Sequence, residues 1–186
     1  MRIISGTARS VKLKPIPGLD VRPTGDRVKE SLFNIIQFDI EGRNALDLFA
    51  GTGQIGIEAL SRGARNVVFV DNFEKAVKTI SENLESTKLA ENAQVEFSDY
   101  KAFIKRTHKE KFDLIFLDPP YNRKLVQKAL NYVETYDIIN IGGIVICETE
   151  VSEVLEESYG KLKKQKEYIY GSVKITKFEK CADSDE

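Results

Sequence analysis

Residues 45–56 read ALDLFAGTGQIG, a short apolar run that contains an aspartate and leads into closely spaced glycines. An apolar run of this length, bounded by a turn, is typical of a buried strand. Gly51, Gly53 and Gly56 match the spacing G-x-G-x-x-G, in which a tight turn lets the backbone approach a nucleotide ligand. The stretch therefore predicts a strand over Ala45–Phe49, a nucleotide-binding loop, and a helix over Ile55–Leu60.

Short apolar runs alternate with segments of helical spacing along the rest of the chain. Strands are expected at Val67–Val70, Gln94–Ser98, Leu114–Leu117 and Ile144–Cys147, and helices at Val28–Ile36 with Thr24 as cap, Phe73–Leu84, from Tyr100, and Leu125–Val133. Glu167–Tyr170 and Val173–Phe178 are separated only by Gly171 and Ser172, which is typical of an antiparallel hairpin. The predicted fold is therefore α/β: a Rossmann-like open sheet, mostly parallel, with an antiparallel C-terminal hairpin at its edge.

Aspartates stand at the carboxyl ends of consecutive predicted strands, where open α/β sheets bind their ligands. Asp71 follows Gly51 by twenty residues, the spacing of an acid that binds ribose hydroxyls in dinucleotide sites. Asp47 would repel a pyrophosphate, but it suits the cationic amino acid end of S-adenosylmethionine, which also carries an adenosine. The loop therefore favours S-adenosylmethionine over a nicotinamide dinucleotide.

Asp99 ends the third of these strands and has two interpretations. Its carboxylate could accept a hydrogen bond from an adenine amino group, with the ring of Tyr100 as an apolar wall. It could equally be the N-cap of the helix that follows.

The fourth predicted strand ends in Asp118, Pro119, Pro120 and Tyr121. Two prolines fix the backbone and remove two N–H donors, so the loop presents acceptors: the Asp118 carboxylate and the Pro119 carbonyl. Acceptors that take both N–H bonds of a planar exocyclic amine favour a pyramidal nitrogen, whose lone pair then points at an electrophilic methyl group. The ring of Tyr121 would stack on the base. The loop predicts methylation of a nucleobase amine; an ordinary turn that closes the strand is the alternative.

The formal net charge of −1 conceals an uneven distribution. Residues 1–29 carry seven basic side chains against two acidic ones, a local net charge of +5, and residues 161–177 carry six lysines against Glu167, again +5. Prolines and glycines predict that the N-terminal segment is irregular and lies on the surface. Because binding follows the local field, nucleic acid is not excluded as a partner. The lysines of 161–177 are also consistent with a solvated face.

The length of 186 residues suits one domain, and no apolar run approaches the ~20 residues of a membrane span. The N-terminus lacks the features of a signal peptide. Cys147 and Cys181 are too few for a disulfide framework and indicate a reducing cytoplasm. His108 and these cysteines lack the spacing of metal ligands, so no metal is expected. Since no apolar run is long enough for a span, no membrane is expected as a partner either.

Several motifs together resemble those of the bacterial 16S ribosomal RNA guanine-N2 methyltransferase family. Asp118–Tyr121 is similar to the [DN]-P-P-[YF] signature of amino-group methyltransferases, and Asp47–Gly53 is similar to their cofactor motif. The N-terminal stretches are more specific: residues 2–6 read RIISG and residues 22–34 read RPTGDRVKESLFN. The resemblance covers nearly the whole chain and implies a class I methyltransferase fold that uses S-adenosylmethionine.

The resemblance also implies roles for individual residues. Cofactor contacts are implied at Asp47, Phe49, Ala50, Gly51, Gly53, Asp71, Asn72, Asp99, Tyr100 and Thr24, the last in a segment that closes over the cofactor. Catalytic roles are implied at Asp118, Pro119, Pro120 and Tyr121, and RNA contacts at Arg2, Arg9, Lys12, Lys14, Arg22 and Arg27. Residues 1–23 are expected to form a basic RNA-binding extension of the same domain, 24–182 the methyltransferase domain and 183–186 an acidic tail. The expected partner is ribosomal RNA, within a 30S subunit or an assembly intermediate.

Other functions fit parts of the same pattern. A DNA adenine-N6 methyltransferase uses the same chemistry but normally needs a separate region to read sequence, for which 186 residues leave little room. A protein glutamine methyltransferase more typically has Asn in place of Asp118. A nicotinamide-dependent oxidoreductase gives the Asp-Pro-Pro-Tyr loop no role, and a non-catalytic RNA-binding module leaves both motifs unused.

Overall fold

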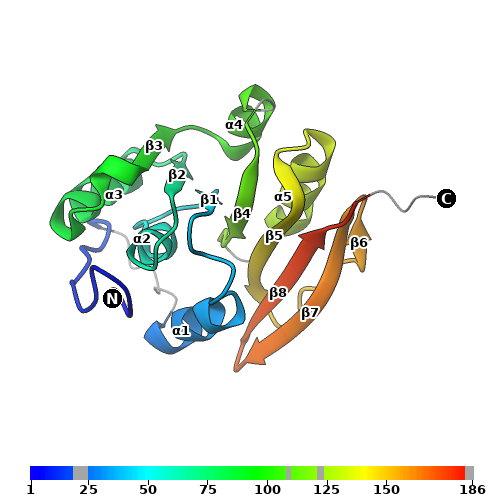
Figure 1. Ribbon diagram of the computed structural model, residues 1–186, viewed down its shortest axis with the longest axis horizontal. Coiled ribbons are helices and arrows are strands. Elements are labelled where there is room, and N and C mark those ends of the chain that lie inside the picture. Colours follow the sequence, from blue (N-terminus) through cyan, green and yellow to red (C-terminus); the bar gives the residue numbers. More distant parts are fainter. Residues whose placement is uncertain (19–24, 108–109, 121–123, 183–186) are drawn as a thin grey trace.

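The computed structural model describes residues 1–18, 25–107, 110–120 and 124–182. Its helices are α1 (Asp26–Ile35), α2 (Gln54–Ser61), α3 (Glu74–Thr87), α4 (Tyr100–Arg106) and α5 (Leu125–Thr135), with a 3-10 turn η1 (Ala90–Asn92). Its strands are β1 (Asn44–Asp47), β2 (Asn66–Asp71), β3 (Ala93–Phe97), β4 (Phe112–Leu117), β5 (Ile139–Glu150), β6 (Ser158–Tyr159), β7 (Leu162–Tyr170) and β8 (Val173–Lys180). The strands form one sheet in the order β3-β2-β1-β4-β5-β8-β7-β6 (Figure 1).

The central part of the sheet is parallel and its C-terminal part is antiparallel, as the sequence predicts. β1 pairs in parallel with β2 and β4, β2 with β3, and β4 with β5. β8 pairs antiparallel with β5, and β7 antiparallel with β8. The edge itself is formed by β6, which the sequence does not reveal because a strand of two residues carries no periodicity.

Helices cover both faces of the sheet (Figure 1). α1, α2 and α3 pack on one face, in a core that includes Phe33, Ile57 and Ile80. α4 and α5 pack on the other face, in a core that includes Phe103 and Leu130. Successive side chains of a strand point to opposite faces, so membership of a core tells which face each strand residue occupies.

Two helix ends bear on the sequence predictions. α2 ends as expected: Gly63 has a φ of +98°, and its N–H donates to the Leu60 carbonyl at 3.0 Å. The N-cap of α1, by contrast, is Gly25 rather than Thr24, because the helix begins at Asp26 and no side chain caps it. Thr24 itself lies outside the described residues.

Residues 1–16 contain no helix or strand, so the prediction of an irregular segment is confirmed, but the prediction that it only lies on the surface is wrong. Arg2 and Lys12 form an antiparallel bridge, and the Ile3 N–H donates to the Val11 carbonyl at 3.0 Å. The segment folds back on itself and places apolar side chains in the core of α1–α3. Ile3, Ala8 and Leu13 belong to that core, and Ile16 is buried as well. The charged side chains of the segment, Arg2, Arg9, Lys12 and Lys14, remain exposed.

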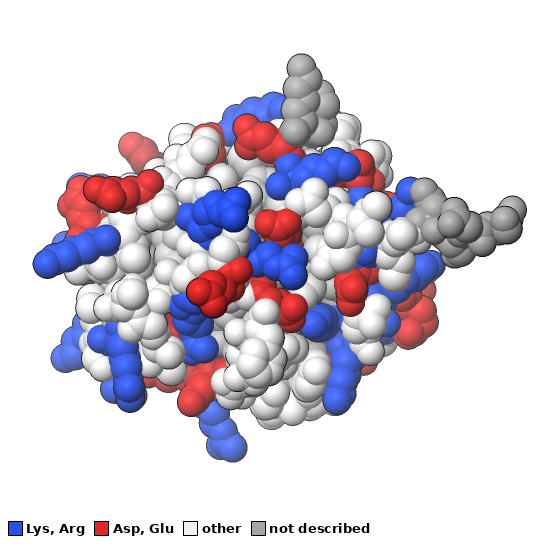
Figure 2. Space-filling view, in the orientation of Figure 1, with Lys and Arg blue, Asp and Glu red and all other residues white. Residues whose placement is uncertain are grey.

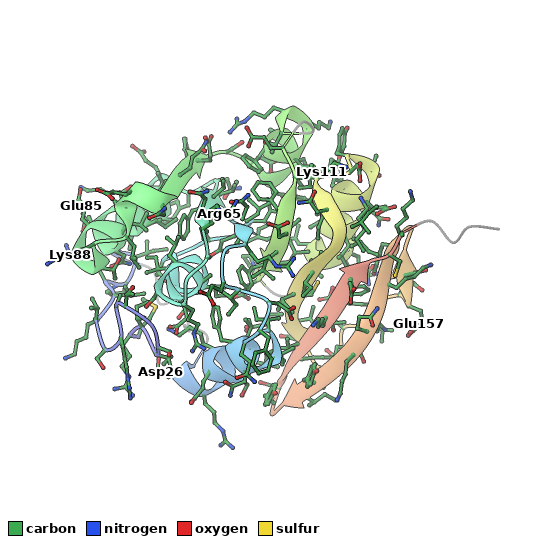
Figure 3. The ribbon with its side chains drawn as sticks, viewed as in Figure 1. Asp26, Arg65, Glu85, Lys88, Lys111 and Glu157 are labelled. Carbon is green, nitrogen blue, oxygen red and sulfur yellow. The ribbon has the colours of Figure 1, made fainter. Side chains whose placement is uncertain are left out.

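The lysines of 161–177 are partly neutralised by acids that lie elsewhere in the fold. Lys164 Nζ lies 2.9 Å from Glu157, which precedes the edge strand β6 (Figure 3). Lys177 Nζ lies 3.3 Å from Asp39, whereas Lys174 Nζ lies 3.6 Å from Glu167, which belongs to the same stretch. A sum over consecutive residues therefore overstates the positive field of this stretch.

Gly6→Ala is expected to loosen the N-terminal segment. Gly6 has a φ of +82°, and a Cβ there would stand 1.7 Å from the Ser61 carbonyl oxygen at the end of α2. Gly171→Ala is the matched control, since its φ of +62° carries the same backbone strain but its Cβ would meet open space. We expect chemical denaturation to show a loss for Gly6→Ala that exceeds the control by ~1–3 kcal/mol. Equal losses would mean that the segment is not packed this closely.

Candidate active site

The loop after β1 is a tight turn built on two glycines. Gly51 and Gly53 have φ of +55° and +77°, and the Gly53 N–H donates to the Ala50 carbonyl at 2.7 Å. Among the described residues, nothing lies within 4 Å of a Cβ placed on Gly51, so this side of the loop is open to a ligand. A Cβ on Gly56 would stand 2.3 Å from the Phe69 ring, so the third glycine allows α2 to pack on β2.

Asp47 ends β1 as a buried carboxyl group. Its side chain is 1% exposed, and its Oδ2 accepts a hydrogen bond from the Gly56 N–H at 2.9 Å. Burial raises the pKa of Asp47 to about 7; the Gly56 N–H lowers it only in part, and the nearby Asp71 raises it further. Asp47 therefore holds the start of α2 and places a group that titrates near neutral pH beside the glycine loop.

Asp71 ends β2 and holds the glycine loop from the other side. Its Oδ2 accepts from the Gly51 N–H at 2.8 Å and its Oδ1 from the Phe73 N–H at 2.9 Å. Burial raises the pKa of Asp71, an effect that the N–H groups of Gly51, Phe73 and Asn72 oppose. Because a carboxylate offers about four acceptor positions, Asp71 can brace the loop and still accept ribose hydroxyls. Asn72, the next residue, is exposed.

Asp99 caps α4, so its N-cap interpretation is confirmed. Its Oδ1 accepts from the N–H groups of Lys101 at 2.9 Å and Ala102 at 3.3 Å. Contact with an adenine amino group stays a prediction, for which Oδ2 has no competing hydrogen bond within the described chain. The ring of Tyr100 packs on Phe49 of the glycine loop, with 5.1 Å between centroids. Its buried hydroxyl has no hydrogen-bond partner among the described residues.

The Asp-Pro-Pro loop stands at the carboxyl end of β4. Asp118 is half-buried, Pro119 buried and Pro120 exposed. β1 and β4 are neighbours, with Asp47 opposite Phe116, so Asp118 lies two residues beyond the level of Asp47. The structure thus brings the predicted catalytic loop beside the predicted cofactor loop. Tyr121 and Arg22, to which the sequence assigns roles, lie outside the described residues, as does Thr24.

Glu58 of α2 is a structural centre that the sequence predictions miss. Its side chain is fully buried and accepts hydrogen bonds from the N–H groups of Ile4 at 2.7 Å and Ser5 at 2.9 Å. Arg62 Nε lies 2.8 Å from its Oε1 and Lys29 Nζ 3.5 Å from its Oε2. Burial lowers the pKa of Lys29, an effect that Glu58 opposes. The signal in the sequence is one acid within an otherwise uncharged helix.

Asn83 of α3 makes a second connection between the N-terminal segment and the glycine loop. It is fully buried, and its Oδ1 accepts from the Lys14 N–H at 2.7 Å. Its Nδ2 donates to the carbonyls of Lys14 at 3.2 Å and Thr52 at 3.0 Å. Thr52 lies between the two loop glycines, so the basic segment and the cofactor loop share one side chain.

The predicted RNA-binding side chains divide into paired and unpaired groups. Arg2 Nε lies 3.3 Å from Asp26 at the start of α1, beside the N-terminal segment (Figure 3), and Lys14 Nζ lies 2.8 Å from Glu82. Arg9, Lys12 and Arg27 are exposed and make no ion pair with the described residues. Basic side chains gather over the N-terminal segment at the lower left of the space-filling view (Figure 2).

A membrane-spanning helix and a cluster of metal ligands are both absent from the described residues. Within residues 1–18, 25–107, 110–120 and 124–182, no helix is long and apolar enough to cross a membrane. The same residues contain no group of three or more His, Cys, Asp or Glu side chains that could hold a metal ion. Cys147 and Cys181 are free thiols.

Asp47→Asn is expected to change how stability depends on pH. The folded protein keeps the Asp47 proton up to about pH 7, whereas the unfolded chain loses it near 3.8, so the stability that Asp47 contributes falls as pH rises between these values. The variant lacks this decline. The free energy of unfolding of the variant minus that of the unaltered protein, measured with denaturant, should therefore be larger at pH 8 than at pH 4 by a few kcal/mol. Parallel pH profiles for the two proteins would contradict the raised pKa.

Asp137→Asn provides a control of opposite sign. Hydrogen bonds from Lys111 and Lys180 lower the pKa of Asp137. The stability it contributes is present above the ordinary pKa of aspartate and is lost as the pH falls through the lowered value.

Comparison with known proteins places this geometry in a family. The family described as "Conserved hypothetical protein 95" matches residues 1–179. "Putative rRNA methyltransferase YlbH" of Bacillus subtilis is 37% identical over 97% of this chain and 99% of its own. "Ribosomal RNA small subunit methyltransferase D" of Haemophilus influenzae is 36% identical over 83% of this chain and 81% of its own.

Solved structures show the same fold. "Putative methyltransferase yhhF" of Escherichia coli superposes with a TM-score of 0.87 at 32% identity, over 98% of this chain and 99% of its own. The 16S rRNA N2 methyltransferase RsmC of Thermus thermophilus, in complex with AdoMet and guanosine, gives 0.70 at 25% identity, over 88% of this chain and 46% of its own. The sheet is therefore that of class I methyltransferases, and the chain belongs to the family described as "Conserved hypothetical protein 95".

Proposed function

We propose that this protein transfers a methyl group from S-adenosylmethionine to the exocyclic N2 of a guanine in 16S ribosomal RNA. The observation that carries the proposal is the position of the Asp118–Pro120 loop, which follows β4 directly beside the glycine loop after β1. The relatives named as ribosomal RNA methyltransferases support RNA as the substrate. The guanosine complex of RsmC supports guanine as the base.

The residues around the glycine loop fit S-adenosylmethionine. Gly51 leaves its side of the loop open, and two buried polar atoms nearby have no hydrogen-bond partner within the described chain, Gln54 Oε1 and Tyr100 Oη. The Asp47 carboxyl would receive the amino group, Asp71 the ribose, and Asp99 with Tyr100 the adenine. When bound, the cofactor supplies an electrophilic methyl group on a sulfonium sulfur. Contacts from Phe49, Ala50, Gly53, Asn72 and Thr24 are part of the same proposal.

The chemistry asked of the protein is chiefly orientation. Asp118 and the Pro119 carbonyl accept the two N–H bonds of the target amine, so that its lone pair is directed out of the ring plane. Pro120 keeps the loop rigid, and Tyr121 would stack on the base. The new N–C bond would form as the methyl–sulfur bond breaks, with the electron pair of that bond left on a neutral thioether. The nitrogen would then be strongly acidic, and Asp118 or water would take its proton.

The N-terminal segment supplies the contact to the RNA backbone. Within the set of proposed RNA contacts, Arg9, Lys12 and Arg27 are exposed and make no ion pair with the described residues, and the set also includes Arg2, Lys14 and Arg22. The substrate is proposed to be ribosomal RNA within a 30S subunit or assembly intermediate, which places the enzyme in the cytoplasm. Residues 1–23 serve as an RNA-binding extension of the methyltransferase domain 24–182, followed by the acidic tail 183–186.

Asp118→Ala should abolish most of the turnover without weakening cofactor binding. Removal of one hydrogen-bond acceptor at the reacting atom is expected to lower kcat at least ~10²-fold. Labelled-methyl transfer to 30S subunits from cells that lack the protein measures kcat, and calorimetry measures the Kd for S-adenosylmethionine. Asp39→Ala, which removes another half-buried carboxylate, located before β1 and paired with Lys177, is the control. A variant with near-normal turnover would remove Asp118 from the mechanism.

The same calorimetry separates the competing functions. Saturable binding of NAD with no binding of S-adenosylmethionine would establish an oxidoreductase instead. Methyl transfer to adenine in duplex DNA, with none to ribosomal RNA, would establish a DNA methyltransferase.

Arg9→Gln combined with Lys12→Gln should weaken RNA binding and make it less sensitive to salt. For every phosphate that the variant no longer neutralises, the slope of log K against log salt should become shallower by about 0.7–0.9. Lys128→Gln with Lys163→Gln removes the same charge from α5 and β7 and should leave the slope unchanged. If both pairs behave alike, the N-terminal segment has no special part in binding RNA.

A further inference from the structure

Glu148 stands beside the catalytic loop, although no motif in the sequence marks it. β4 and β5 pair in parallel with Leu117 opposite Cys147, so the next residues, Asp118 and Glu148, lie side by side at the carboxyl end of the sheet. Phe116 and Ile146, two residues earlier, both belong to the core on the α1–α3 face. Glu148 lies inside β5, so alternation places its side chain on that same face, and Asp118 is the first residue after β4 at the same level.

Glu148 is also buried more deeply than glutamate side chains usually are. It is 3% exposed, whereas its strand neighbour Glu150 is half-buried. A carboxylate at this depth forms strong hydrogen bonds with N–H donors, because the surrounding dielectric is low. Adjacent strands lie about 4.8 Å apart, and glutamate is one methylene longer than aspartate, so both carboxylates can reach the edge of one planar ring.

The proposed function gives this pair a specific task. Guanine carries two adjacent donors on its Watson–Crick edge, the N2 amino group and N1–H. In adenine the amino group lies beside N1, and N1 is a hydrogen-bond acceptor. N1 would face the glutamate carboxylate, which is also an acceptor, so the two would repel each other. An acceptor next to the amine-binding loop therefore favours guanine over adenine, both by one added hydrogen bond and by repulsion of the other base.

We infer that Glu148 is the residue that selects guanine, by accepting the N1–H bond while Asp118 and the Pro119 carbonyl accept the N2–H bonds. The inference rests on the proposed function, because it concerns the base held at the same site. It extends that function by assigning recognition of the ring to Glu148, and it leaves activation of the amine to Asp118 and Pro119. Two amino purines that differ at N1 can therefore test it.

The experiment compares Glu148→Gln with the unaltered protein on two RNA substrates. One carries guanine at the target position, and the other carries 2-aminopurine, which keeps the N2 amine but has an acceptor at N1. We expect Glu148→Gln to lower kcat/KM on guanine by roughly 10- to 100-fold, the loss of one hydrogen bond to a charged group. On 2-aminopurine the loss should be at least tenfold smaller, since the Gln amide can donate to N1.

Glu179→Gln is the matched control, since it lies on the same face of the β5–β8 pair at its opposite end, across from Ile144. It should leave the guanine to 2-aminopurine ratio unchanged. Calorimetry should give the same Kd for S-adenosylmethionine in all three proteins. An equal loss on both RNA substrates, or no loss on guanine, would overturn the role of Glu148. If the unaltered protein methylates neither RNA, the proposed function itself fails.

Discussion

The buried carboxylate of Glu58 is the interaction on which the arrangement of the site depends. It lies on α2, the helix that the glycine loop opens, and it accepts backbone N–H groups from Ile4 and Ser5 together with the charges of Arg62 and Lys29. A buried charge with this many partners is stable only when all of them are present, because removing one leaves the others desolvated. The N-terminal segment, α1 and α2 are therefore fixed as a unit. This explains why the motifs at residues 2–6 and 22–34 occur together with a glycine loop fifty residues into the chain.

The aspartates at the strand ends build the loop before they can serve a ligand. Asp71 receives Gly51, Asp47 receives Gly56, and Asp99 caps α4, so each carboxylate already holds backbone N–H groups. These bonds fix the loop without any ligand, and the energetic cost of ordering it is met by folding rather than by binding. A cofactor that uses the remaining acceptor positions would thus meet a preorganised surface.

Local patterns predicted most of the fold, and long-range pairing explains the rest. Strand and helix periods, the glycine turn and the Gly171–Ser172 hairpin are visible in a few consecutive residues, and the structure confirms them. The two-residue strand β6 is too short to show a period. The packing of residues 1–16 and the ion pair of Lys177 with Asp39 join distant parts of the chain, which no local window contains. Glu148 escaped for the same reason: only the register of β5 against β4 brings it to Asp118.

Charge is separated within the proposed site in a way that orients an RNA substrate. Carboxylates gather at the carboxyl ends of β1, β2, β4 and β5, and the unpaired cations Arg9 and Lys12 lie outside, on a segment bound to α2 and α3. Phosphates are attracted to the second region and repelled by the first, whereas a base edge rich in N–H donors is attracted to the first. An RNA strand can satisfy both fields only if its backbone follows the N-terminal segment and one base turns away from it into the sheet end. A base that is paired in the substrate must then be flipped out. The carboxylates that repel its phosphates would be the groups that accept hydrogen bonds from its amine.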